Sequence, residues 1–530
     1  MKNIFKLLLL SSVLLVSCDD DLLEPFAPGA LTEDVAITTS TNLRNLMNST
    51  YGLLYNRDEA VFTSVFTDEA GIGYANGGQG TTDDYIFFLN QSSDSPSAIW
   101  VSNYFALSRA NRVIKLADQI TPVDAADAEI LKRLKAEALA VRAYCHIKIL
   151  SYFSPDPKND NALAGILADR IITTSEHDLL RTTNGAFYAS IHSDLNAAIA
   201  LFNTVAPSAL YTGQAKTYYA NVNFAKAIKA RAYALKGDYV NAEIWANDVI
   251  TTSGIALATY ANYNQIWFTD TEPADTEVIF RLKRTTIQNS QATNMHNGWC
   301  SVRPNLAGSP FYEVGRALHN ILNPTNIAGS AFNASTTLDI RAKAIIAPSS
   351  TIDPNYATSA NYIGTDRLII QKYGGVATGT TTAATTAGGG FNNDFKLVRL
   401  SEMYLIRAEA RVAAGDLPGA ANAVDAIRDK RFSTNQVTPV YATPTDAWRG
   451  ILKERRIEFA FEGYRFIDLK RIGTLANVGL DRDPADYSSA TSNYPAGNPT
   501  NLPLTSFKFA LPIPQDEFNA NPGVQQNPGY

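Results

Sequence analysis

The chain has 530 residues, of which 45% are hydrophobic, 10% aromatic and 18% charged, and its formal net charge is −6. This length can bury a large core, and the aromatic content excludes a predominantly disordered chain. The negative charge and the absence of runs of Lys and Arg argue against a nucleic-acid partner. Three cysteines are too few for a disulfide scaffold. The low charged fraction favours a surface that meets a neutral, polar ligand.

The N-terminus resembles the signal of a bacterial lipoprotein. Lys2 and Lys6 precede the apolar stretch Leu7–Val16, which is too short to span a membrane and typical of a signal-peptide core. It ends at Ser17-Cys18, as in a lipobox, so we expect residues 1–17 to be removed and Cys18 to be lipidated. An acidic run, Asp19–Asp21, follows and resembles the surface-export signal of Bacteroidetes lipoproteins. The alternative is an ordinary secretory signal with an incidental cysteine.

Helical periodicity dominates the rest of the chain. The predicted helices cover residues 99–119, 128–153, 186–203, 221–236, 239–251, 397–414, 417–431 and 445–471. Cys145 lies on the apolar stripe of the second of these, so we expect it in the core. Pairing of Cys145 with Cys300 stays open, because nothing in the sequence favours or forbids it.

Two helical stretches are related in sequence. Each has a glycine followed by an aspartate, Gly237-Asp238 in one and Gly415-Asp416 in the other, with alanines five positions before and after the glycine. Glycine can end one helix, aspartate can cap the next, and the alanines allow two antiparallel helices to approach closely. This pattern is typical of tetratricopeptide helix pairs, here separated by a long insertion.

The remaining segments are rich in loop-forming residues. The insertion, about 255–396, is rich in Thr, Asn, Gly and Pro and contains two predicted strands, Val278–Leu282 and Arg367–Gln371. A second loop-rich segment covers 56–97, and a C-terminal tail covers 473–530. No linker separates independent domains, so we expect one domain over 18–530, with its helical scaffold at about 99–251 and 397–471.

Enzyme signatures are absent from the sequence. It contains neither a Gly-x-Ser-x-Gly elbow nor a phosphate-binding Gly-Lys, and its five histidines lack metal-ligand spacing. Asp481, Asp483 and Asp486 could contact calcium, but their spacing matches no known calcium loop, and a solvated turn is favoured. We therefore expect a protein that is not an enzyme and that uses no cofactor or metal.

Four segments carry a resemblance to a known family: the lipobox, Phe395–Ala410, Glu454–Arg471 and Leu511–Tyr530, which ends in Gln-Asn-Pro-Gly-Tyr. Their residues and order resemble the SusD/RagB family of outer-membrane, nutrient-binding lipoproteins over essentially the whole chain. The resemblance implies a mainly α fold of tetratricopeptide-like helix pairs, with long loop insertions and a few short strands. It also implies that the charged block Glu454–Arg471 is a hallmark of the fold, in agreement with its alternation of charges and aromatics, which predicts a structural ion-pair network.

The resemblance further implies a function. Members of this family lie against a SusC-like TonB-dependent transporter, capture oligosaccharide outside the cell and pass it inward without chemistry. We therefore expect a lipid-anchored protein on the outer membrane that faces outward and binds a glycan. The alternatives are a binder of peptides or another nutrient with the same role, a protein-interaction scaffold, and a surface glycoside hydrolase.

Candidate ligand contacts must come from the loops, because aromatics on helices are mostly core. A sugar presents apolar C–H faces and rims of hydroxyls, so its site needs exposed aromatics and planar polar side chains. Trp100, Trp245 and Trp448 lie on predicted helices and are expected in the core. The loop candidates, each of which could instead pack within its own loop, are Asp68, Glu69, Tyr74, Asn76, Trp267, Trp299, Arg303, Asn305, Phe311 and Tyr312.

Overall fold

The structure is a computed structural model. It describes residues 36–74, 76, 83–173, 176, 179–205, 216–268, 277–284, 295–299, 310–323, 335–359, 364–374, 393–487, 494 and 496–530. The fold is mainly α-helical with short strands, which confirms the predicted fold class.

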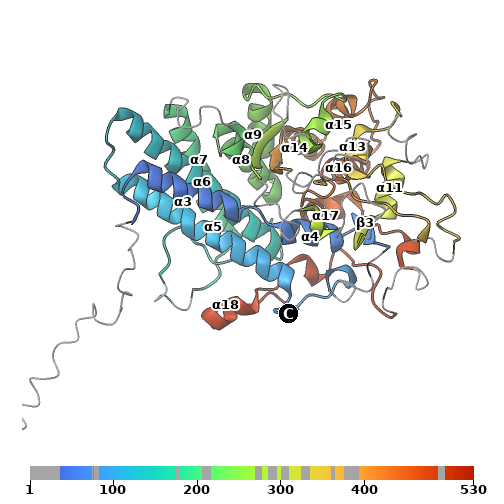
Figure 1. The fold of residues 1–530 in the computed structure, drawn as a ribbon, viewed down its shortest axis with the longest axis horizontal. Helices are drawn as coiled ribbons and strands as arrows, with labels where there is room; N and C mark the ends of the chain where they lie inside the picture. The colour runs from blue at the N-terminus through green and yellow to red at the C-terminus, as the bar shows by residue number, and fades with distance from the viewer. Residues whose placement is uncertain are drawn as a thin grey trace, which may run out of the picture.

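Long helices form one side of the molecule, and short elements of the insertion form the other (Figure 1). The longer helices are α3 (Ser40–Leu53), α4 (Arg57–Val65), α5 (Asp94–Gln119), α6 (Ala125–Phe153), α7 (Asn184–Thr204), α8 (Val222–Lys236), α9 (Tyr239–Thr252), α14 (Leu400–Ala413), α15 (Leu417–Arg431), α16 (Pro444–Glu458) and α17 (Arg465–Ala476). Short helices are α10 (Tyr263–Phe268), α11 (Arg316–Leu322), α13 (Ile340–Ile345) and α18 (Gln515–Ala520). The strands β1 (Ala70–Ile72) and β3 (Tyr312–Val314) pair antiparallel, as do β2 (Val278–Leu282) and β4 (Phe395–Arg399).

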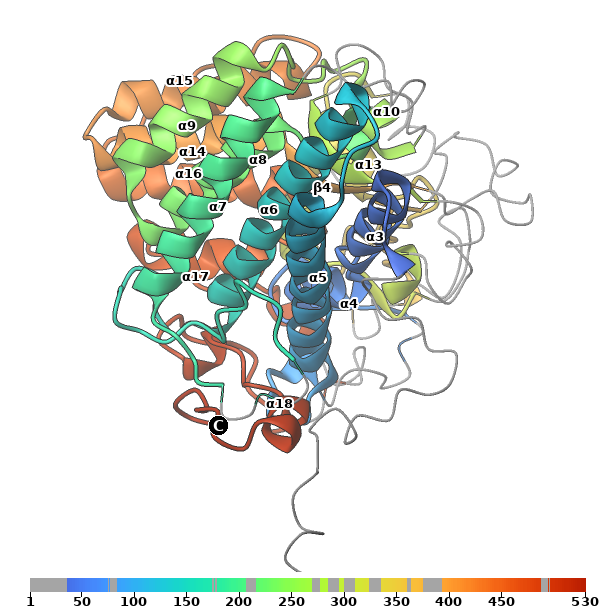
Figure 2. The same cartoon turned by 90° about the vertical axis from the view of Figure 1, so that its left-hand side faces the viewer.

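The two related helix pairs form as predicted. Gly237 ends α8 at φ 82° and Gly415 follows α14 at φ 80°, a left-handed conformation that favours glycine. The next residue caps the following helix in both pairs: Asp238 accepts a hydrogen bond from the Asn241 N–H, and Asp416 accepts one from the Gly419 N–H. Helix α9 also packs against α14, so the two pairs are neighbours in space although the insertion separates them in sequence (Figure 2).

Three predicted boundaries were wrong. The predicted helix 445–471 is two helices, α16 and α17, joined by a turn in which Phe461 and Gly463 have φ 61° and 88°. The predicted helix 397–414 begins only at Leu400, because the residues before it pair with β2. The loop-rich segment 56–97 contains α4 and the start of α5. A short, continuously buried run has no clear period, so the partner that it meets decides between helix and strand.

The predicted strand Arg367–Gln371 does not form a regular strand. The structure has two isolated bridges there, Ile346 to Ile370 and Thr351 to Arg367. The predicted strand Val278–Leu282 forms as β2.

The terminal Gln-Asn-Pro-Gly-Tyr motif fixes the tail to the end of α6. The Asn527 amide donates to the carbonyls of Phe153 and Leu511, each at 2.7 Å, and its oxygen accepts a hydrogen bond from Arg181 at 2.9 Å. Arg181 also donates to Phe153 and to backbone carbonyls of the preceding loop. Carbonyls at a helix C-terminus lack partners within the helix, so these side chains satisfy groups that would otherwise be buried and unbonded.

Trp100, Trp448 and Cys145 lie in one continuous hydrophobic core, and Trp245 packs against it. Trp100 and Trp448 are buried as predicted, whereas Trp245 is half-buried and carries the Lys229 ammonium 4.0 Å above its ring. Cys145 is buried and is a free thiol. Within the described residues, no helix is both long and apolar enough to span a membrane.

Candidate ligand-binding site

A short antiparallel ribbon, β1 with β3, brings together the two loop segments that supplied most candidate residues. Gly71 lies opposite Glu313, and after β1 the Gly73 N–H donates to the Phe311 carbonyl at 2.9 Å. A side-chain carbon on Gly73 would lie 2.3 Å from the Pro310 oxygen. The close approach of the two segments therefore requires glycine at this position. Figure 1 shows β3 beside α11, on the side formed by the insertion.

Four candidates meet at this ribbon, but they differ in exposure. Asn76 is fully buried and donates to the Phe311 carbonyl at 2.8 Å. Tyr312 is buried, with its ring stacked on Tyr85, and Phe311 is half-buried. Tyr74 alone among the four is well exposed, at 46%. A ligand can therefore reach Tyr74 directly, whereas Asn76 and Tyr312 hold the loops in place.

Two further residues, Glu313 and Arg367, belong to this arrangement although no sequence motif selects them. The carboxylate of Glu313, on β3, accepts hydrogen bonds from the Tyr74 N–H at 2.8 Å and the Leu368 N–H at 2.6 Å. Arg367, next to Leu368, places its guanidinium 3.8 Å from the centre of the Tyr74 ring. No motif connects these positions in sequence, since only the folded chain brings them together.

Trp299 and Trp267 are core residues, which corrects their selection as ligand contacts. Trp299 is 0% exposed, and its indole N–H donates to the Ser64 hydroxyl at 2.8 Å. Its ring packs edge-on against Phe461. Trp267 is also 0% exposed, with the Lys372 ammonium 4.1 Å above its ring. The packing alternative therefore accounts for both tryptophans.

Asp68 and Glu69 are buried as well, so neither presents a carboxylate to a ligand. Asp68 accepts two hydrogen bonds of 2.7 Å from Arg465. Burial favours a raised pKa for Asp68, but Arg456 and Arg465 outweigh it and hold the pKa well below its usual range. Glu69 accepts a hydrogen bond from the Phe461 N–H, and burial raises its pKa to about 8.

Several predictions fall on residues outside those that the structure describes. They concern the signal peptide 1–17, the lipidated Cys18, Cys300, and the candidate contacts Arg303 and Asn305.

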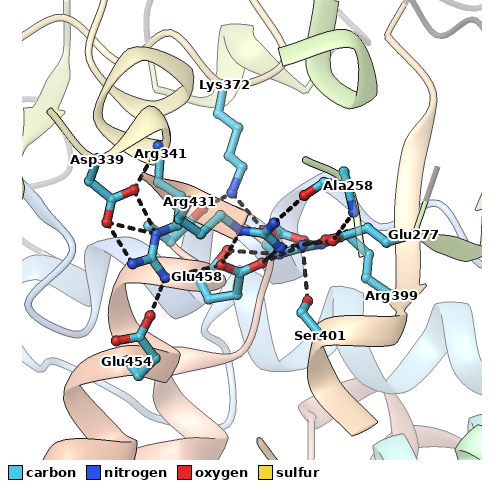
Figure 3. A network of polar contacts seen from close by, with 12 residues as sticks. Ala258, Glu277, Asp339, Arg341, Lys372, Arg399, Ser401, Arg431, Glu454 and Glu458 are labelled. Atoms are coloured by element: carbon cyan, nitrogen blue, oxygen red, sulfur yellow. Dashed lines mark hydrogen bonds and ion pairs between the residues drawn. The ribbon is translucent and has the colours of Figure 1, made fainter. Parts of the chain in front are cut away.

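The charged block Glu454–Arg471 forms buried ion pairs, as predicted. Glu458 lies at the centre: it accepts hydrogen bonds from Arg399 at 2.7 Å, from Arg431 at 2.8 and 3.1 Å, and from Arg341 at 3.1 Å (Figure 3). Burial favours a raised pKa for Glu458, but the three guanidinium groups together hold it well below the usual range. Glu277, Asp339, Glu454, Glu462 and Lys372 extend the network.

The three aspartates considered for calcium have protein partners. Asp481 pairs with Arg456 at 3.0 Å, Asp483 accepts a hydrogen bond from the Tyr356 hydroxyl, and Asp486 is buried. In the part of the chain that the structure describes, no three or more His, Cys, Asp or Glu side chains form a group that could hold a metal ion.

Burial of Glu69 predicts a pH-dependent stability. Its pKa rises from 4.5 to about 8 on folding, so between these values the folded chain retains a proton that the unfolded chain releases. Stability from this group is therefore complete below pH 4.5 and lost as the pH rises through 8. We expect Glu69→Gln to remove about 1–3 kcal/mol of the pH dependence of the unfolding free energy between pH 5 and 8. Urea unfolding of both proteins across this range tests it, and parallel pH profiles would contradict it.

Comparison with known proteins matches both parts of the helical scaffold to one family. A family model described as "SusD family" matches residues 320–530, and a second, described as "Starch-binding associating with outer membrane", matches residues 31–233. The chain therefore belongs to the SusD/RagB family, as its sequence motifs indicated.

Individual relatives are distant. The chain is 23% identical over 344 residues to the starch-binding protein SusD of Bacteroides thetaiotaomicron, an alignment that covers 57% of this chain and 58% of that protein. It is 22% identical to the SusD-like protein P2 of Formosa agariphila over 97% of both chains. A crystal structure of a SusD superfamily protein from Bacteroides thetaiotaomicron superposes with a TM-score of 0.69 at 22% identity, over 92% of this chain and 100% of the other. At this identity the superposition shows the fold.

Proposed function

We propose that this protein is a cell-surface lipoprotein that binds oligo- or polysaccharide and delivers it to a TonB-dependent outer-membrane transporter. The observation that carries the proposal is its membership of the SusD/RagB family, with matches in both the N-terminal and C-terminal parts of the chain. One family model is described as starch-binding and outer-membrane associated, and one relative is a starch-binding protein. The lipobox supports a lipid anchor through Cys18, and the acidic run Asp19–Asp21 supports an outward-facing position.

The geometry at the β1–β3 ribbon supports a glycan as the ligand. Tyr74 offers a half-exposed aromatic ring, and its backbone N–H is held by a hydrogen bond to the buried Glu313. Aromatic faces pack against the C–H faces of sugar rings, and planar polar groups beside them bond the hydroxyls. We therefore propose that the ligand contacts Tyr74 and the neighbouring Phe311. Arg303 and Asn305 remain proposed contacts from the same insertion.

The binding role requires no chemistry from the protein. The carboxylates of the Glu454–Arg471 block, together with Asp68, are committed to arginines in the interior. A general acid or base must reach the atom whose proton it transfers, and these carboxylates are buried. This favours a binding protein over the alternative of a surface glycoside hydrolase.

Titration calorimetry of the mature chain against a panel of polysaccharides tests the function. We expect at least one glycan to bind, and Tyr74→Ala to weaken that binding at least about tenfold, which corresponds to about 1.4 kcal/mol for one lost stacking contact. Phe105→Ala is the matched control, because Phe105 is 59% exposed on α5 and lies outside the proposed site. Its affinity should equal that of the parent.

Three other outcomes would change the conclusion. Binding of peptides and of no glycan would favour the alternative nutrient role. Release of reducing ends from a bound polysaccharide would identify a hydrolase. A chain that never co-purifies with a TonB-dependent barrel from native membranes would remove the transporter from the proposal.

A further inference from the structure

We propose that Tyr74 and Arg367 form a subsite for an acidic sugar residue, one that carries a carboxylate or a sulfate ester. The inference rests on the proposed glycan-binding function and specifies the class of glycan. Its starting point is the stacked pair at the surface, in which the Arg367 guanidinium lies 3.8 Å from the centre of the Tyr74 ring. Tyr74 stays 46% exposed in this arrangement.

The charge of Arg367 lacks a counter-ion within the described residues. Its Nε atom is buried without a hydrogen-bond partner, and none of the carboxylates that the structure describes lies within ion-pair distance of the guanidinium. Other arginines with a buried, unbonded nitrogen each have a carboxylate within that distance; they are Arg281, Arg316, Arg455, Arg456 and Arg465. A partly desolvated cation is stabilised by pairing with an anion, so an anionic ligand group would complete this site.

The pair is fixed before any ligand arrives. One oxygen of the Glu313 carboxylate accepts the Tyr74 N–H, and the other accepts the N–H of Leu368, next to Arg367. Glu313 is buried, and its oxygens face these backbone groups. The Thr351 carbonyl holds the Arg367 backbone from a third segment, through a 2.7 Å hydrogen bond from the Arg367 N–H. A preformed site loses less conformational entropy on binding, so the ligand gains affinity.

The two side chains match the two features of an acidic sugar. A guanidinium presents parallel N–H groups that suit the paired oxygens of a carboxylate or sulfate. An exposed tyrosine ring offers an apolar face to the C–H groups of a pyranose. A uronic acid or a sulfated sugar carries both features on one ring. The overall net charge of −6 opposes acidic polymers, so selectivity must come from this local cation.

Calorimetry with two matched probe pairs tests the subsite. The first pair is an oligogalacturonate and its methyl ester, and the second is a sulfated galactan oligosaccharide and its desulfated form. We expect the charged member of one pair to bind at least about tenfold more tightly than its neutral counterpart, with the difference reduced by added salt. The pair that shows the preference identifies carboxylate or sulfate as the recognised group.

Variants assign that preference to Arg367. Arg367→Gln should abolish the preference, so that the charged and neutral members bind with equal affinity, and should leave the melting temperature unaltered. Arg407→Gln is the matched control, because Arg407 also stacks on a tyrosine, Tyr404, but lies on α14. It should retain the preference of the parent.

The outcomes separate the subsite from the wider function. Equal binding of charged and neutral members, or a preference that survives Arg367→Gln, would overturn the acidic subsite and leave glycan binding intact. Failure to bind any polysaccharide, in this experiment and in the wider panel, would overturn the proposed function together with the subsite.

Discussion

Glu458→Gln is expected to lower the free energy of unfolding by about 3–5 kcal/mol, the range measured when one partner of a buried ion pair is removed. Glu458 is 0% exposed and bonds Arg399, Arg431 and Arg341. Glutamine keeps the shape of the side chain but removes the negative charge that the three guanidinium groups share. Urea unfolding at neutral pH, followed by circular dichroism, measures the change.

Glu176→Gln provides the control for this substitution. Glu176 bonds Arg170 through both oxygens, at 2.9 and 2.6 Å, but this pair lies at the surface. Solvent screens exposed ion pairs, so the same chemical change should leave the unfolding curve almost unaltered. Equal effects of the two substitutions would show that burial of the Glu458 network does not determine its contribution.

Trp299→Ala should also destabilise the fold by about 3–5 kcal/mol, as for other buried tryptophans. The substitution leaves a cavity beside Phe461 and removes the hydrogen bond from the Trp299 indole to Ser64. Any effect on glycan affinity should be small under conditions where the variant is folded, since the ring is 0% exposed. Thermal or urea unfolding, paired with calorimetry, measures both properties.

Trp299→Phe serves as the matched variant. It keeps an aromatic ring against Phe461 but loses the hydrogen bond to Ser64, so its destabilisation should lie between those of the parent and Trp299→Ala. A tenfold loss of glycan affinity in Trp299→Ala with an unchanged unfolding curve would contradict this picture. It would show that Trp299 contacts the ligand.

Local sequence patterns predicted the helix pairs because their determinants lie close together in the chain. Glycine in a left-handed conformation and an aspartate cap act within a few residues, so Gly237-Asp238 and Gly415-Asp416 identify helix ends without any knowledge of the fold. The charged block was also interpretable. Its charges alternate with aromatics, and buried charges persist only when they are paired.

Solvent exposure of the loop residues could not be predicted in the same way. Trp299 and Tyr74 both lie next to glycine in loop-rich sequence, yet one is 0% and the other 46% exposed. Burial depends on which distant segment covers a side chain, and for Trp299 these segments are α4 and the turn after α16. Such contacts leave no periodic signal in either segment.

The class of protein, the helical scaffold and the presence of a buried ion network follow from the amino-acid sequence, because each depends on local residue patterns or on motifs shared with a family. The composition of the candidate site follows only from the folded chain. Glu313 joins Tyr74 to Arg367 only through contacts between segments far apart in the chain. The free energy of such contacts depends on distance and burial, which are set once the core has packed.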